Sequence, residues 1–140
     1  MNTVDEIGLR RDQVVFEITE TERLPAVKHL RRIMEFYREE GFQVALDDVG
    51  AGYSSLNVLV ELKPDFVKLD MELVRNVDRD KSKAIVARKL IETVKELELA
   101  TIAEGMERPE ELEWVRERGA DFAQGYLFAR PATPPPGLAL

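Results

Sequence analysis

Short apolar runs and amphipathic segments alternate along the whole 140-residue chain. Runs rich in β-branched and aromatic residues predict strands, and segments whose apolar side chains recur every three or four residues predict helices. The predicted strands occupy residues 13–18, 42–46, 65–69, 100–103 and 121–128. The predicted helices occupy residues 27–37, a short segment at 54–62, then 86–97 and 109–118.

Regular alternation of strand and helix is typical of a parallel sheet whose strands are joined by crossover helices. We therefore predict an α/β fold with about five parallel strands. The sequence shows neither an internal repeat nor a linker that would divide it, so residues 1–131 are expected to form one unit. The proline-rich segment 132–140 is expected to be an extended or disordered tail.

Composition narrows the class of protein. The net charge of −7 argues against broad binding to DNA or RNA, which requires clustered Lys and Arg. No apolar run approaches the roughly 18 residues of a membrane span, and the N-terminus has no signal-peptide pattern, so we expect a cytoplasmic protein. The absence of Cys and the single His exclude a Cys/His zinc site.

A polar or charged side chain stands where each predicted strand ends. These residues are Glu17, Asp47 with Asp48, Lys68 with Asp70, Glu104 and Gln124. Because the carboxyl ends of parallel strands lie on one edge of a sheet, five separate segments deliver these groups to one place. Clustered carboxylates bind hard divalent cations such as Mg2+ or Mn2+, and a pair of such ions suits phosphodiester hydrolysis.

Each position also has an ordinary structural interpretation. A single Asp or Glu at a strand end is more often a helix cap or a loop residue than a ligand. An Asp pair near Gly50 and Gly52 is a common turn composition. Lys68 is harder to interpret as a surface lysine, because Val67 and Leu69 flank it in a strand that is expected to be buried. The joint pattern over all the strands favours a site.

Five segments resemble, in order and in spacing, the motifs of the EAL-domain phosphodiesterases of cyclic di-GMP. The segments are "FEITE" (16–20), "LDDVGAGYSSL" (46–56), "DFVKLD" (65–70), "IAEGME" (102–107) and "QGYLFARP" (124–131). The resemblance covers nearly the whole chain. It implies a barrel of the (β/α)8 type that binds cyclic di-GMP over its C-terminal rim.

The resemblance also implies a role for each site residue. The metal ligands would be Glu17, Asp47, Asp48 and Glu104. Lys68 would lie near the attacking water, and Glu104 would act as the base. Residues expected to contact the substrate or to support the metal-binding loop are Glu20, Asp70, Glu107 and Gln124. Val49 replaces the usual Phe on the packing side of that loop.

The family's Glu-Ala-Leu signature, whose Glu binds metal, and an Asn ligand on the next strand have no counterpart in these 140 residues. A complete barrel takes about 200 residues or more, so we expect a partial barrel, the C-terminal part of an EAL domain. Two functions stay open: a phosphodiesterase that is poorly active alone, and a non-catalytic module that binds cyclic di-GMP or another protein. An open sheet exposes edges and an apolar face, so a homo-oligomer is also expected.

Overall fold

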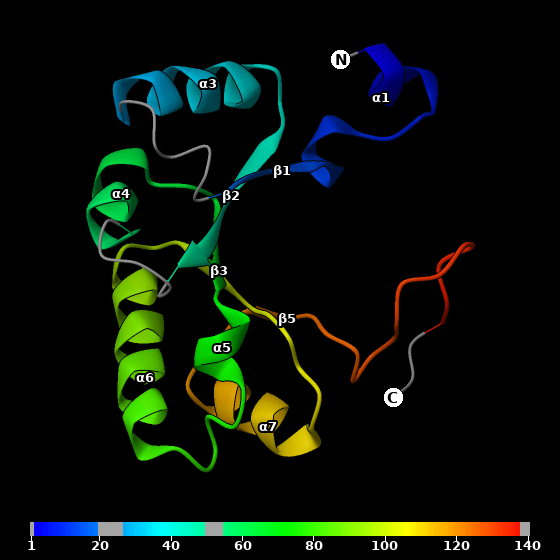
Figure 1. Cartoon of the computed structure of the whole chain (residues 1–140). Helices are drawn as coiled ribbons and strands as arrows, with labels where there is room; N and C mark the ends of the chain where they lie inside the picture. Colours follow the sequence, from blue (N-terminus) through cyan, green and yellow to red (C-terminus); the bar gives the residue numbers. More distant parts are fainter. Residues whose placement is uncertain (1, 20–26, 50–54, 138–140) are drawn as a thin grey trace.

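The computed structural model describes residues 2–19, 27–49 and 55–137 of the chain (Figure 1). Within them, five parallel strands form one sheet in the order of the chain. The strands are β1 (Val15–Ile18), β2 (Gln43–Val49), β3 (Phe66–Leu69), β4 (Ala100–Ala103) and β5 (Phe122–Ala123). The predicted α/β class and the five parallel strands are confirmed, and the sheet is open rather than closed into a barrel.

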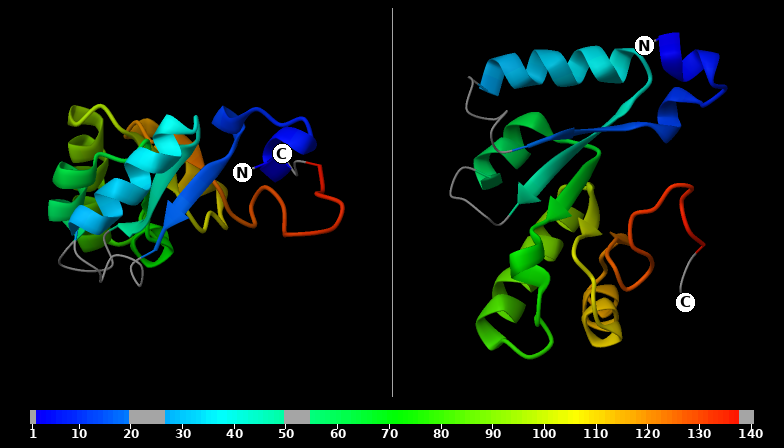
Figure 2. Two further views of the ribbon diagram at one scale, coloured as in Figure 1. Left: turned by 90° about the horizontal axis from the view of Figure 1, so that it is seen from above. Right: turned by 45° about the vertical axis from the view of Figure 1, so that its right-hand side comes forward.

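Helices connect the strands and lie together on one side of the sheet, as the two views of Figure 2 show for α3, α4 and α6. The four longer helices are α3 (Val27–Glu39), α4 (Ser55–Leu62), α6 (Lys81–Glu96) and α7 (Pro109–Glu117). Shorter ones are α1 (Asn2–Glu6), the 3-10 turn η1 (Arg11–Gln13) and α5 (Met71–Val74). No helix in the described ranges is long and apolar enough to cross a membrane.

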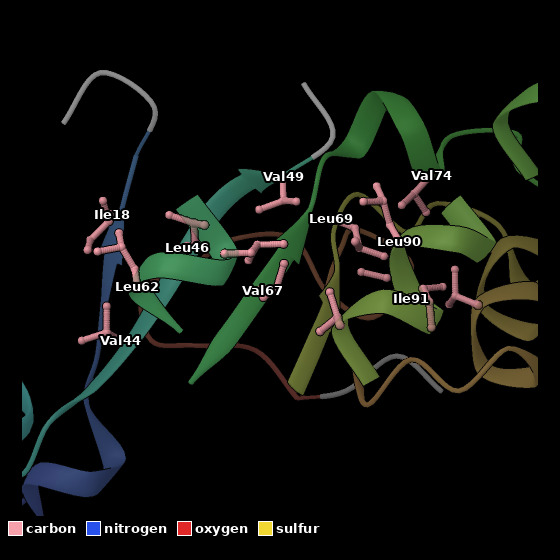
Figure 3. Packing of buried hydrophobic residues seen from close by; sticks show 14 of the residues in the cluster. Ile18, Val44, Leu46, Val49, Leu62, Val67, Leu69, Val74, Leu90 and Ile91 are labelled. Carbon is pink, nitrogen blue, oxygen red and sulfur yellow. The ribbon is translucent and has the colours of Figure 1, made fainter. Parts of the chain in front are cut away.

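The core lies between the sheet and these helices. Alternate residues of the strands point toward the helices, and on β2 and β3 they include Val44, Leu46, Val67 and Leu69, all buried (Figure 3). Helices α4 and α6 cover them with Leu62, Leu90 and Ile91 among other apolar side chains. The buried apolar face therefore fixes which strand residues point the other way, toward the open face of the sheet.

The open face carries both apolar and charged side chains. Val15 and Phe122 are exposed by 39% and 54%, although both belong to strands. Phe122 packs edge-on against Phe66 of β3, with ring centroids 5.8 Å apart. In a closed barrel this face would be the packed interior, so its exposure here is a direct consequence of the open sheet.

The predicted strand at 121–128 is wrong beyond Ala123. Only Phe122 and Ala123 pair as a strand, and the chain then turns. The backbone N–H of Met106 donates to the Gln124 carbonyl at 3.1 Å, and the Leu127 N–H donates to the Met106 carbonyl at 2.9 Å. A Cβ on Gly125 would lie 2.3 Å from the Met106 nitrogen, so glycine is required for this close approach of two backbones.

Candidate functional site

A β-bulge lies at the end of β2, next to β3. Leu46 pairs with Val67 and Val49 pairs with Leu69, so Asp47 and Asp48 together stand opposite the single residue Lys68. A bulge of this kind places two residues of one strand against one of its neighbour and re-aims the side chains. Regular alternation would have directed one of two adjacent carboxylates into the core, and the bulge interrupts that alternation.

Three carboxylates surround the ammonium group of Lys68. Its Nζ lies 2.7 Å from Oε1 of Glu17, 2.9 Å from Oε1 of Glu104 and 3.9 Å from Oδ1 of Asp47. The four residues come from β1, β2, β3 and the end of β4, which are adjacent in the sheet. Parallel pairing therefore brings together side chains that are up to 87 positions apart in sequence (17 to 104).

Lys68 is buried and its carboxylate partners are partly open. The side chain of Lys68 is 5% exposed, against 14% for Glu104, 16% for Asp47 and 46% for Glu17. Burial disfavours the charged form of Lys68, but hydrogen bonds to Glu17 and Glu104 and the charges of Glu104 and Asp47 outweigh it and raise its pKa. Lys68 therefore stays protonated at neutral pH, and the cluster carries more negative than positive charge.

A pocket of about 310 Å3 adjoins this cluster. Glu104, Glu107 and Gln124 line it, together with Arg75 from the segment after α5 and Tyr126 from the turn after β5. The guanidinium of Arg75 lies 3.6 Å from the carboxylate of Glu107, so the pocket contains groups of both charges. Such a pocket can receive a polar, anionic molecule next to the acidic cluster.

The structure separates the predicted site residues into two groups. Glu17, Asp47, Lys68 and Glu104 come together. Asp70 instead caps α5, where its side chain accepts a hydrogen bond from the Glu72 N–H at 3.2 Å. Glu107 and Gln124 line the pocket. Glu20 and the side chain of Asp48 lie outside the described residues, although the backbone of Asp48 belongs to β2.

Two residues that the sequence reasoning missed belong to this region. Arg75 lines the pocket, and Glu111 of α7 is a fully buried carboxylate. Nothing at the level of pattern distinguishes Arg75 from other surface arginines. For Glu111 a signal was available, since Glu at the third position of a helix that begins with Pro109 favours a capping interaction.

The carboxylate oxygens suit a divalent cation in chemistry, because Mg2+ and Mn2+ prefer hard oxygen donors. Lys68 nevertheless stands in the middle of them. Among the described residues, no group of three or more acidic or histidine side chains is arranged so that it could hold a metal ion. The donor set therefore fits a metal in type, while the described side chains converge on an ammonium group.

The sheet, the strand-end cluster and the motifs define a class of protein. The family model described as "EAL domain" matches residues 2–131, so the chain belongs to the EAL domain family. Its fold is accordingly that of the EAL domains, which resemble TIM barrels, with the described strands forming an open part of such a sheet.

Individual relatives agree with this assignment. The chain is 35% identical over 133 residues to a probable cyclic di-GMP phosphodiesterase, PdeG of Escherichia coli, covering 95% of this chain and 26% of that protein. A standalone EAL protein of Vibrio cholerae, solved in a c-di-GMP bound form, matches with a TM-score of 0.91 and 35% identity, covering 98% of this chain and 58% of that one. BlrP1 of Klebsiella pneumoniae, solved as a manganese/cy-diGMP complex, matches with a TM-score of 0.86 and 37% identity, covering 94% of this chain and 33% of that one. The chain thus spans about a quarter of the first relative and under two thirds of the two structures.

Proposed function

We propose that this chain carries out the hydrolysis of cyclic di-GMP to the linear dinucleotide, as part of an EAL-type phosphodiesterase. The observation that carries the proposal is the convergence of Glu17, Asp47 and Glu104 on the buried ammonium of Lys68. Such a cluster at the C-terminal edge of a parallel sheet is where α/β proteins bind and transform ligands. The names of its relatives favour the same substrate.

The metal site is part of this proposal. Glu17, Asp47, Asp48 and Glu104 would hold Mg2+ or Mn2+. A bound divalent cation would supply a more acidic water and neutralise charge on the phosphate. The Asp47→Asn and Asp48→Asn variants should bind Mn2+ more weakly in calorimetry, whereas Asp12→Asn, at the opposite end of β1, should not. Identical binding in all four proteins would place the ions elsewhere.

The chain's own residues would act as follows. Lys68 would donate hydrogen bonds to the attacking water or to a phosphate oxygen, and Glu104 would accept the proton of that water. The substrate would extend into the pocket beside Arg75, where Glu107 and Gln124 are available for contact. Asp70 would support this wall through its cap on α5, and Glu20 would support the segment that carries the Asp pair.

We propose that these 140 residues alone turn over slowly. The family resemblance expects two further metal ligands that the sequence does not contain, and residues that act as a unit lose activity non-additively. The test is to incubate the protein with cyclic di-GMP and Mn2+ and to follow the linear product by chromatography, with Glu104→Ala as the blank. Turnover of about one per second, within the ordinary enzymatic range, that vanishes in Glu104→Ala would contradict slow turnover but would support the function.

A non-catalytic module that binds cyclic di-GMP is the second candidate. It is favoured by the arrangement of the described carboxylates, which converge on Lys68 and do not form a metal-binding group. Calorimetry separates the two candidates. Binding of cyclic di-GMP with no linear product after long incubation with Mn2+ would select the module, and product that depends on Glu104 would select the enzyme.

We also propose that the chain is cytoplasmic and forms a homo-oligomer. β1 and β5 are the edge strands of the sheet, and the open face exposes Val15 and Phe122. A second apolar surface lies between α4 and α6, where Val60 and Val86 are about half exposed. Unpaired edges and apolar faces favour association. Sedimentation equilibrium should show a dimer or larger species, and a monomer at high micromolar concentration would count against it.

A further inference from the structure

Glu111 is a buried carboxylate outside the Lys68 cluster. It lies in the first turn of α7 and is only 1% exposed. Its Oε1 accepts hydrogen bonds from the backbone N–H groups of Glu107, at 3.2 Å, and Arg108, at 3.0 Å. Its Oε2 accepts from the backbone N–H of Asn76, at 2.7 Å. The last contact joins segments that are 35 residues apart in sequence.

A second link reinforces this connection. The guanidinium of Arg108 donates to Asp78 at 3.2 Å and to the side-chain oxygen of Asn76 at 3.2 Å, and it lies 3.7 Å from Glu111. The two linked segments are the turn between α5 and α6 and the loop that leads from β4 to α7. Glu111 holds the backbone of both segments, whereas the Arg108 guanidinium binds side chains, so Glu111 fixes their separation more directly.

Residues of α5, the residue that follows it and the loop after β4 line the same 310 Å3 pocket. Met71 and Arg75 contribute one part of the lining and Glu104, Gly105 and Glu107 another, and the two parts meet where the Arg75 guanidinium lies 3.6 Å from the Glu107 carboxylate. We propose that Glu111 is a positioning residue, which holds these two segments together and so sets the placement of Arg75 and Glu107 around a bound cyclic dinucleotide. The proposal rests on the function proposed above, because it assumes that the nucleotide enters this pocket.

The loop needs such an anchor for a physical reason. Gly105 has φ of +74°, and a Cβ there would lie 2.7 Å from Cβ of Met71, so the loop passes close to α5 through a residue without a side chain. Glycine leaves the backbone more conformational freedom than any other residue. A buried carboxylate that accepts three N–H groups removes that freedom beyond the glycine, because its hydrogen bonds tie the loop at Glu107 and Arg108 to the turn at Asn76.

A conservative variant separates the hydrogen bonds to Glu107 and Arg108 from the hydrogen bond to Asn76. In Glu111→Gln one side-chain oxygen remains and the other becomes an NH2 group, which cannot accept a hydrogen bond from a backbone N–H. The amide can therefore satisfy Glu107 and Arg108, or Asn76, but not both segments. Glu113→Gln is the matched control, since it makes the same change of charge at an exposed position of the same helix.

The experiment measures cyclic di-GMP binding in the presence of Ca2+ by calorimetry, on the full chain and both variants. Glu111→Gln should weaken nucleotide binding about tenfold, because the link to one of the two segments is lost. Mn2+ binding without nucleotide should match wild type, since Glu111 is not among the carboxylates that surround Lys68. In turnover assays the loss should appear as a raised KM with little change in kcat. Glu113→Gln should behave as wild type in each assay.

Each other outcome overturns the proposal at a defined level. Nucleotide binding equal to wild type in a folded Glu111→Gln protein would remove the positioning role and leave the proposed function intact. Equal weakening of nucleotide and Mn2+ binding would show that Glu111 only stabilises the fold. A wild-type chain that binds no cyclic di-GMP would refute the proposed function, and the positioning role with it.

Discussion

Two charged side chains are buried in the described part of this chain, and their surroundings differ in kind. Glu111 is balanced by three backbone N–H groups and the nearby guanidinium of Arg108. Lys68 is instead surrounded by an excess of opposite charge from three carboxylates. A group balanced by backbone donors fixes structure, whereas surplus charge beside a pocket remains available to a ligand, a proton or a cation. The environment of a buried charge therefore indicates its task better than its burial does.

Lys68→Met should break the charged cluster with the largest effect on stability. Removing one partner of a buried ion pair typically costs about 3–5 kcal/mol, and because Glu17 is half exposed we expect a loss of about 3 kcal/mol. Urea denaturation in the presence of a chelator measures it. Added Mn2+ should recover part of the loss, since it would supply the missing positive charge. The exposed Lys89→Met is the control, and a loss no greater than that of the control would contradict the prediction.

Glu104→Gln tests whether the surplus charge performs chemistry. The variant keeps an oxygen that can accept a hydrogen bond from Lys68, so it should remain folded. Its amide cannot take up a proton from the attacking water. Turnover of cyclic di-GMP should fall about a hundredfold, equivalent to about 2.7 kcal/mol in the barrier. Product chromatography measures the rate. Wild-type turnover in this variant would remove Glu104 from the role of base.

The pH dependence of stability should distinguish Glu111 from an ordinary surface carboxylate. Burial alone would raise its pKa, but the N–H groups of Asn76, Arg108 and Glu107 and the charge of Arg108 outweigh it and lower the pKa. Its contribution, about 1–2 kcal/mol, is therefore present above its ordinary pKa of 4.5 and is lost as the pH falls through the folded-state value.

Urea denaturation from neutral pH down to about pH 3 measures this contribution. The free energy of unfolding of wild type should fall more steeply below pH 4.5 than that of Glu111→Gln, and the two curves should approach each other in acid. The Arg108 hydrogen bond also lowers the pKa of Asp78, but that interaction is present in both proteins. Parallel curves for the two proteins would refute the assignment.

Asp70→Ala should give the smallest effect and should decide between two interpretations of this residue. Losing an N-cap costs about 1 kcal/mol, which thermal unfolding can detect. If Asp70 only caps α5, cyclic di-GMP binding should change little. A large loss of nucleotide affinity with wild-type stability would show that Asp70 contacts the substrate directly, as the resemblance expects.

Periodicity predicted the strands and the longer helices because the apolar side chains of each element recur on the one face that is buried. β4 was predicted with its observed bounds, and the end of 121–128 was wrong because the close approach of Gly125 to Met106 replaces strand pairing. Parallel topology was enough to expect Glu17, Asp47, Lys68 and Glu104 on one edge. Parallel topology could not predict the role of Glu111, because that role comes from a hydrogen bond with the backbone of Asn76, 35 residues away in the sequence.

The bulge in β2 also determines the parity of the strand. Val44 and Leu46 face the helices as even-numbered residues, and after the inserted position the odd-numbered Val49 is buried in the same core. Removing one residue from the Asp pair would restore regular pairing and leave Val49 opposite Leu69 on the core side, because Leu46 and Val49 would then lie two positions apart. A deletion of one Asp would therefore remove one carboxylate and keep the core residues in place, whereas a deletion at a regularly paired position of β2 would reverse which side chains face the helices.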